Sequence, residues 1–141
     1  MASWVLCMIL LLAALPEALG ETRYGKFQRQ HVDNPRTSVR PALRYCDTMM
    51  MRRQMAGPTV PCKFRNTFVH TPAGDLVAAC YRTPNNDGTY STSYAMSITV
   101  CTRNGGAAWP CNYRIRQARH YVRVNCEYGR PVHLNSTATT P

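Results

Sequence analysis

Six cysteines between residues 46 and 126 limit how this chain can fold more than any other feature. They are Cys46, Cys62, Cys80, Cys101, Cys111 and Cys126. The chain begins with an apolar run over residues 4–15, and the small-residue segment Ala18-Leu19-Gly20 follows it. This pattern predicts a secretory signal peptide over residues 1–20, and hence a secreted protein. An even number of cysteines behind such a leader predicts three disulfides, with fifteen pairings left open.

The remainder, residues 21–141, is short and contains no internal repeat, so we expect one domain. It has no C-x-x-C pair or tight Cys/His cluster, and we therefore expect no metal and no cofactor. Its charge is strongly positive. Loss of residues 1–20 removes one acid, Glu17, and no base, so the formal net charge of +10 becomes +11. Such a field attracts polyanions: nucleic acid, heparan-type glycans or anionic membranes.

The order of the predicted elements indicates an α+β domain, with helices early and antiparallel strands late. Helices are expected over residues 21–33, 41–53 and 75–81. Strands are expected over residues 62–70, 90–102, 109–115, 121–127 and 130–134. We expect a tight connection near Gln117, with His120 in that turn or on an exposed edge, and a frayed tail over residues 136–141.

The predicted strand over residues 62–70 carries side chains that could bind a substrate. Alternation places Lys63, Arg65 and Thr67 on one face, and Phe64 and Phe68 on the other, where both could anchor the strand in a core. Two cations and a hydroxyl in a row would suit a phosphodiester next to a base.

Histidine is the natural residue for acid–base chemistry without a metal, because its imidazole titrates near neutrality. The chain has four histidines, at positions 31, 70, 120 and 133. His31 lies four residues after Phe27, so burial of Phe27 would direct His31 toward the protein body. Spacing alone does not say which two histidines converge.

Three motifs resemble those of the pancreatic-type (ribonuclease A) superfamily and occur in the same order. They are K-F-Q-R-Q-H at residues 26–31, C-K-F-R-N-T-F at residues 62–68 and P-V-H at residues 131–133. The resemblance implies three short helices and a long, bent antiparallel sheet. It also implies the disulfides Cys46–Cys101, Cys62–Cys111 and Cys80–Cys126. The six cysteines and the segment G-G-A-A-W-P-C at residues 105–111 resemble the angiogenin-like, three-disulfide branch.

The resemblance implies a secreted endoribonuclease that cleaves single-stranded RNA after pyrimidines. His31 would be the base, His133 the acid and Lys63 the cation that stabilises the transition state, forming a 2′,3′-cyclic phosphate that is then hydrolysed. Gln30 would bind the phosphate and Thr67 the base. Asn66, Glu127 and Leu134 are further residues expected to contact RNA, Glu127 at a second base.

Two departures from the family pattern bear on activity. Asn135 stands where the family usually has an aspartate that orients the acid histidine, so we expect a lower pKa for His133 and a weaker enzyme. Val100 replaces an aspartate that tunes the pyrimidine choice of Thr67, which leaves the preference between C and U open. Asn135-Ser136-Thr137 is also the one N-glycosylation sequon in the chain.

Two other functions fit the same sequence. The arginines at positions 114, 116, 119 and 123, expected on one hairpin, would suit a cationic host-defence protein that binds bacterial membranes or lipopolysaccharide. An angiogenin-like signalling ligand is the other alternative, with Arg52-Arg53 as a weak match to a basic nuclear-entry cluster. Expected partners are RNA, anionic glycans or membranes, and a ribonuclease inhibitor protein, with the chain as a monomer.

Overall fold

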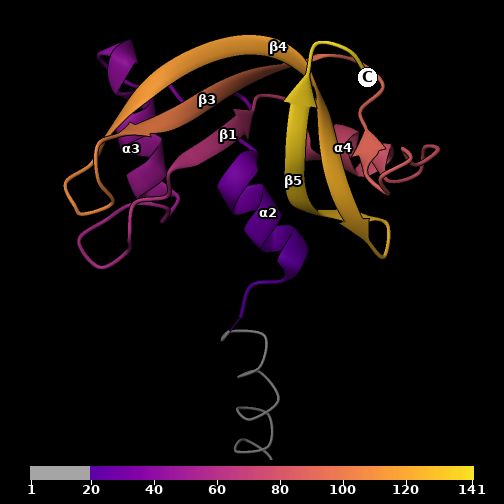
Figure 1. Cartoon of the computed structure of the whole chain (residues 1–141), viewed down its shortest axis with the longest axis horizontal. Coiled ribbons are helices and arrows are strands. Elements are labelled where there is room, and N and C mark those ends of the chain that lie inside the picture. Colours follow the sequence, from indigo (N-terminus) through magenta and orange to yellow (C-terminus); the bar gives the residue numbers. More distant parts are fainter. Residues whose placement is uncertain (1–19) are drawn as a thin grey trace, which may run out of the picture.

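The computed structural model describes residues 20–141 (Figure 1). The expected signal peptide lies outside these residues, apart from Gly20. The helices are α2 (Arg23–His31), a short 3-10 helix η1 (Ala42–Arg44), α3 (Tyr45–Arg52) and α4 (Ala73–Ala79). The strands are β1 (Arg65–Val69), β2 (Tyr90–Ser91), β3 (Met96–Asn104), β4 (Asn112–Glu127) and β5 (Arg130–Ala138). None of the helices in residues 20–141 combines the length and apolarity needed to cross a membrane.

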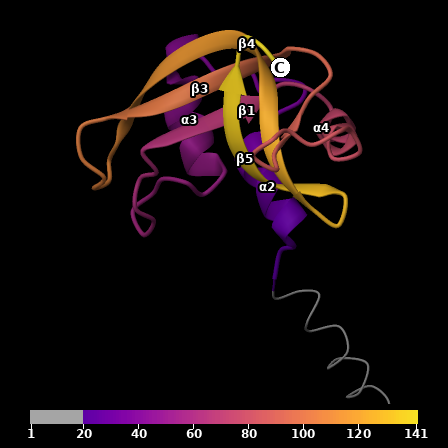
Figure 2. The same ribbon diagram turned by 45° about the vertical axis from the view of Figure 1, so that its right-hand side comes forward.

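One long strand, β4, organises the antiparallel sheet. Its first half pairs with β3, which in turn pairs with β1, and its second half pairs with β5 on one edge and β2 on the other. Figures 1 and 2 show β4 as an arch that spans the molecule from the β3 side to the β5 side. The expectation of a long, bent antiparallel sheet with three helices is therefore confirmed.

Two hydrophobic clusters pack against the two halves of this sheet. The first contains Tyr45 and Met49 of α3 and Phe68 of β1. The second contains Phe27 of α2 and Val122 of β4, with residues of α4 and β3. Helix α2 lies between β1 and β5, so its end reaches both halves of the molecule (Figure 1).

Three disulfides join elements that are far apart in sequence. Cys46–Cys101 ties α3 to β3, Cys62–Cys111 ties the segment before β1 to the segment before β4, and Cys80–Cys126 ties the end of α4 to β4. The pairing that the family resemblance implied is confirmed for all three.

The two strands predicted over residues 109–115 and 121–127 are a single strand. The expected turn near Gln117 is wrong, because the ladder with β3 continues through this residue and His120 pairs with Met96. Gln117 and its neighbours Ala118 and Arg119 include no glycine or proline to break the ladder. The four arginines thus lie on one strand and not on a hairpin.

Three further expectations are corrected by the structure. The tail predicted from residue 136 is strand up to Ala138, because Ser136, Thr137 and Ala138 pair with β4. Phe64 is 58% exposed under the guanidinium of Arg103 and does not anchor the core, whereas Phe68 is fully buried as predicted. The predicted strand over residues 90–102 is interrupted between β2 and β3.

Candidate active site

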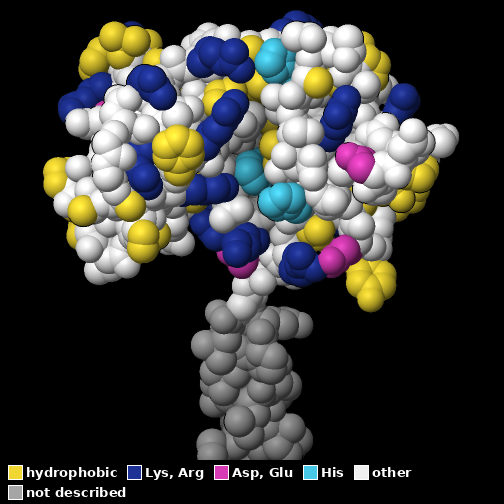
Figure 3. All heavy atoms as spheres, in the orientation of Figure 1, with side chains coloured by type: hydrophobic (Ala, Val, Ile, Leu, Met, Phe, Trp, Pro, Cys, Tyr) yellow, Lys and Arg dark blue, Asp and Glu magenta, His cyan; other side chains and the backbone are white. Residues whose placement is uncertain are grey.

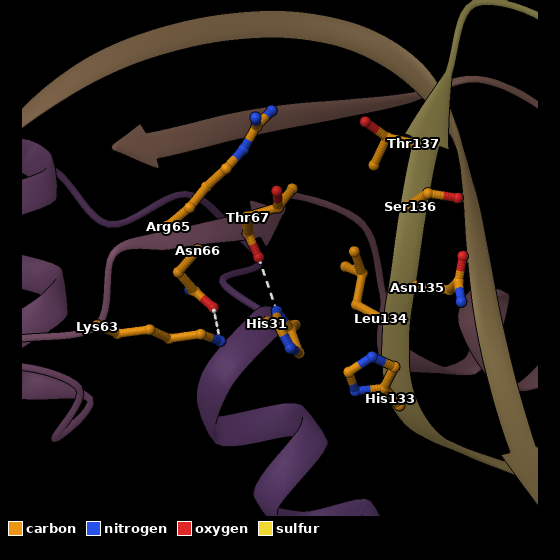
Figure 4. A pocket seen from close by; sticks show the side chains of 10 residues that line it. All are labelled: His31, Lys63, Arg65, Asn66, Thr67, His133, Leu134, Asn135, Ser136 and Thr137. Atoms are coloured by element: carbon orange, nitrogen blue, oxygen red, sulfur yellow. Dashed lines mark hydrogen bonds between the residues drawn. The ribbon is translucent and has the colours of Figure 1, made fainter. Parts of the chain in front are cut away.

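A cavity of about 480 Å³ lies between β1 and β5, beside the last turn of α2 (Figure 4). Its lining residues are His31, Lys63, Arg65, Asn66, Thr67, His133, Leu134, Asn135, Ser136 and Thr137. The candidate residues His31, Lys63 and His133 therefore meet in one place, although they come from α2, the segment before β1, and β5. Thr67, Asn66 and Leu134 join them there.

His31 is the last residue of α2 and is only 6% exposed. Its Nδ1 lies 2.9 Å from the carbonyl oxygen of Thr67. A carbonyl only accepts hydrogen bonds, so Nδ1 carries the hydrogen and Nε2 of the neutral ring keeps its lone pair. Burial lowers the pKa of His31 to about 4, the Thr67 carbonyl opposes this, and the positive charges of Lys63 and His133 lower it further. At neutral pH the ring is thus a free base.

Two side chains from other elements satisfy the carbonyl groups at the end of α2. Arg53 Nη1 donates to the carbonyl oxygens of Arg29 and Val32, each at 2.8 Å. Asn66 Nδ2 donates to the Gln30 carbonyl at 2.8 Å. The end of a helix otherwise leaves such carbonyls without partners. These contacts therefore hold the turn that carries His31.

Lys63 is fixed by the same asparagine. Its Nζ donates to Asn66 Oδ1 at 3.0 Å, so Asn66 links the lysine to the end of α2. Burial lowers the pKa of Lys63, and the positive charge of Lys26 lowers it further. The structure thus places one cation beside His31 through a defined hydrogen-bond chain.

His133 and Leu134 lie between two irregularities in the β4–β5 ladder. The register slips on both sides, which leaves Val132 and Asn135 without partners on β4. Strict alternation would place His133 and Asn135 on a common face, and the slip between Leu134 and Ser136 removes that relation. Figure 4 shows the imidazole of His133 and the side chain of Leu134 directed toward His31 and Thr67.

The bulge also separates Asn135 from His133. Figure 4 shows the exposed amide of Asn135 directed away from the imidazole, and no hydrogen bond joins the two side chains in residues 20–141. The orienting contact expected of Asn135 is therefore absent from this structure.

Two other predicted site residues do not line the cavity. Gln30 contributes its backbone carbonyl to Asn66, and Glu127 forms an ion pair with Arg23 beside a smaller pocket that Tyr128 also lines. Val100 lies directly opposite Thr67 in the β1–β3 ladder and is buried.

Sequence reasoning missed Ser136 and Thr137, which also line the cavity. Both fall in the segment predicted as a tail, because a strand-favouring threonine alone does not reveal the pairing with β4. The strand alternation of residues 62–70 did place Arg65 on the correct face, with Lys63 and Thr67.

The remaining two histidines lie outside the cavity lining. His70 donates from Nδ1 to the Asp33 carbonyl at 2.8 Å, and its Nε2 lies 2.7 Å from the Thr99 hydroxyl. These contacts tie the end of β1 to the segment after α2 and to β3, so His70 has a structural role. His120 lies within β4, and its Nδ1 is 3.1 Å from Thr137 Oγ1. Within residues 20–141, no three His, Cys, Asp or Glu side chains are grouped closely enough to hold a metal ion.

The face that bears the site is rich in cations. Figure 3 shows imidazoles in the central hollow, with Lys and Arg side chains around them and few acids. A polyanion would meet a positive potential at this face. Geometry and charge together fit a site for acid–base chemistry on a phosphate ester.

Comparison with known proteins agrees with this reading. A family model described as pancreatic ribonuclease matches residues 22–135. Ribonuclease CL2 of Gallus gallus is 56% identical over 118 residues, which cover 83% of this chain and 98% of that protein. Angiogenin of Gallus gallus is 37% identical over 136 residues, covering 95% and 94%. The crystal structure of green turtle egg white ribonuclease matches with a TM-score of 0.78 at 37% identity, covering 84% of this chain and 100% of that one. The chain therefore belongs to the pancreatic ribonuclease family.

Proposed function

We propose that this protein is a secreted endoribonuclease that cleaves single-stranded RNA on the 3′ side of pyrimidines. The observation that carries the proposal is the convergence of His31, Lys63 and His133 around one cavity that Thr67 also lines. The expected leader and the three disulfides support secretion, because disulfides persist in oxidising compartments.

The first step is an internal transesterification. Nε2 of His31 takes the proton of the ribose 2′-hydroxyl as the 2′-oxygen attacks phosphorus. The bond from phosphorus to the 5′-oxygen breaks, and His133 gives its proton to that oxygen. The products are a 2′,3′-cyclic phosphate and a free 5′-hydroxyl. In the second step the roles reverse, and water opens the ring. The hydrogen bond of His31 Nδ1 to Thr67 supports this assignment, because it leaves Nε2 as the base.

Lys63 stabilises the negative charge that builds up on the phosphoryl oxygens in the transition state. Its bond to Asn66 supports this role, because a cation that is already positioned requires little reorganisation during the reaction. DNA lacks the 2′-hydroxyl, so the mechanism itself restricts cleavage to RNA.

The enzyme is also proposed to be weaker than its relatives. No hydrogen bond to the His133 ring is found among the described residues, and Asn135 supplies no carboxylate to stabilise the imidazolium. Asn135 lines the cavity although its amide points away from the imidazole, so the carboxylate of Asn135→Asp would act on His133 through its charge. This substitution should raise kcat/KM and shift the limb of the pH–rate profile that reports the acid. Identical limbs in the two proteins would refute this explanation.

Cleavage of a panel of dinucleoside phosphates tests the main proposal. Wild-type protein should cleave those with a 5′ pyrimidine, and His31→Ala and His133→Ala should each lower kcat/KM by roughly 10²- to 10⁴-fold. Arg52→Gln is the control, because Arg52 is exposed and does not line the cavity. Cleavage that survives both histidine substitutions would exclude this mechanism.

A second function rests on the cationic surface. Arg114, Arg116, Arg119 and Arg123 all lie on β4, and the first three are exposed. Strand alternation places Arg114 and Arg116 on one face of β4 and Arg119 and Arg123 on the other. Guanidinium groups on both faces would suit anionic glycans or bacterial membranes. Killing of bacteria that survives His133→Ala but is lost when these arginines are neutralised would establish it as separate from cleavage.

An angiogenin-like signalling role is favoured by the relatives that bear that name. The Arg52-Arg53 pair gives this role little support, because the guanidinium of Arg53 is hydrogen-bonded to backbone carbonyls at the end of α2. We also propose that the protein is a monomer and binds a ribonuclease inhibitor protein. Light scattering and a pull-down with such an inhibitor would test these two points.

A further inference from the structure

A buried acceptor on β4 has no hydrogen-bond partner. Oδ1 of Asn125 is buried, and nothing in residues 20–141 donates a hydrogen bond to it. Leaving a buried acceptor unpaired costs about 1 to 3 kcal/mol, so such an atom calls for an explanation. Asn125 belongs to none of the three sequence motifs and does not line the cavity. The chemistry proposed above gives it no role.

The β4–β5 ladder places this acceptor beside the proposed acid. Asn125 lies directly opposite His133, and Val124 lies opposite Leu134, with a slip of register on each side of these two pairs. Residues directly opposite each other in an antiparallel ladder share a face, with Cβ atoms about 4.5 to 5.5 Å apart. Rotation of the two side chains therefore brings the Asn125 amide and the His133 ring within hydrogen-bond reach.

His133 needs an acceptor of this kind. Its ring is exposed and has no hydrogen-bond partner in the described part of the chain, and the amide of Asn135 points away from it (Figure 4). The inference rests on the proposed function, in which His133 acts as an imidazolium. Both nitrogens of an imidazolium donate hydrogen bonds. One N–H faces the departing 5′-oxygen, and the other requires an acceptor.

We propose that Asn125 is the positioning residue for the acid histidine: its Oδ1 accepts the second N–H of His133 and so directs the first toward the departing 5′-oxygen. The neighbouring strand thus supplies the orienting contact that was expected of Asn135. A neutral amide makes a charge-assisted hydrogen bond with the imidazolium and orients it, although it adds no negative charge.

Two substrates that differ in their leaving group test this role. The 5′-oxygen of uridylyl-adenosine needs a proton to depart, whereas 4-nitrophenolate departs without one from uridine 3′-(4-nitrophenyl phosphate). Asn125→Leu keeps a similar shape and removes the acceptor. It should lower kcat for uridylyl-adenosine about tenfold, the effect of one hydrogen bond, and leave kcat for the nitrophenyl ester and both KM values nearly unchanged. Asn125→Asp retains an acceptor and should match or exceed wild-type activity on the dinucleotide.

Asn112→Leu is the matched control. Asn112 is the first residue of β4, is exposed and does not line the cavity, so its substitution should leave both reactions unchanged. Equal losses on the two substrates in Asn125→Leu would indicate a general structural role, and a loss confined to KM would indicate substrate binding. Either result overturns the proposal. If Asn125→Leu does not fold, as judged by circular dichroism, Asn125→Ala decides, because it also removes the acceptor.

NMR separates this inference from the proposed function. If wild-type protein cleaves neither substrate, the proposed activity fails, and titration of the His133 ring still tests the contact. The acceptor binds the imidazolium more strongly than the neutral ring, so the midpoint of this titration should fall by about 0.5 to 1 pH unit in Asn125→Leu. An unchanged midpoint overturns the inference. The variant retains the charged and titratable residues of the elements that contact β5, which include Lys26 and His31 of α2, Asp75 of α4, and Arg123 and Glu127 of β4.

Discussion

Arg53 should be essential to the stability of this protein, whereas its neighbour Arg52 should not. Arg53 Nη1 makes two 2.8 Å hydrogen bonds to carbonyls at the end of α2, and Arg29 Nη1 donates in return to the Arg53 carbonyl at 2.6 Å. Charge-assisted hydrogen bonds contribute roughly 1.5 to 3 kcal/mol each. Because the Arg53 side chain is 25% exposed, we take the lower value for its two short bonds. The glutamine side chain introduced by Arg53→Gln is too short to replace them.

We therefore predict that Arg53→Gln lowers the free energy of unfolding by about 3 kcal/mol, or the melting temperature by about 10 °C. Arg52→Gln removes the same charge from an exposed side chain and should change stability by less than about 0.5 kcal/mol. Urea denaturation followed by circular dichroism measures both. Equal stability of the two variants would refute the role given to Arg53.

Arg53→Gln should also lower the catalytic activity of the site. A loose end of α2 misplaces His31, so we expect kcat for dinucleotide cleavage to fall about tenfold while KM changes little. Arg53→Lys restores the charge without the fork of donors and should recover only part of the stability. A loss of stability with full kcat at low temperature would show that Arg53 holds the fold and not the position of His31.

Three further predictions concern stability. The pKa of buried His31 is about 4 against an ordinary 6.5, so the unfolded chain binds the proton more readily than the folded protein. The free energy of unfolding should therefore fall as pH drops from 6.5 to 4, by about 3 kcal/mol more in wild type than in His31→Gln. The same pH dependence of stability in the two proteins would contradict this. Asp33→Asn should cost about 3 kcal/mol, because buried Asp33 accepts hydrogen bonds from Tyr45 and from the backbone and hydroxyl of Thr37; the exposed Asp87→Asn is the control, and comparable losses would count against the buried network. Phe68→Ala should cost about 3 to 5 kcal/mol, and Phe64→Ala less than about 1 kcal/mol, in thermal denaturation; a reversed order would show that the exposed ring of Phe64 matters more than its burial suggests.

The sequence was sufficient for those parts of the site that sit inside local motifs. The motifs around His31, Lys63 and His133, and the alternation that placed Arg65 beside Thr67, could be interpreted without coordinates. The cysteine count alone predicted three bridges, but their pairing needed the family resemblance, because spacing does not reveal which cysteines meet.

The errors arose where pairing partners decide the local structure. Nothing in the sequence near Gln117 shows that β3 continues alongside it, so one strand was predicted as two. Thr137 became part of the cavity only because β4 extends far enough to pair with it. Side-chain burial was likewise not predictable from residue type alone. The aromatic ring of Phe64 is exposed to solvent, whereas the charged side chain of Arg53 binds backbone carbonyls at the end of α2.

Because β4 runs without a break, it limits where insertions and deletions can occur in relatives of this protein. Within the sheet, the strand that bears Thr67 is connected to the strand that bears His133 only through β3 and β4. The length and register of β4 therefore set the distance between the two halves of the site. One residue inserted near Ala118 would turn every following side chain to the opposite face and displace His133 relative to Thr67. The connections at residues 105–111 and 128–129 lie at the two ends of β4, and changes of length there leave the register within β4 unchanged. Length variation in active relatives should therefore fall in these connections and spare the middle of the strand.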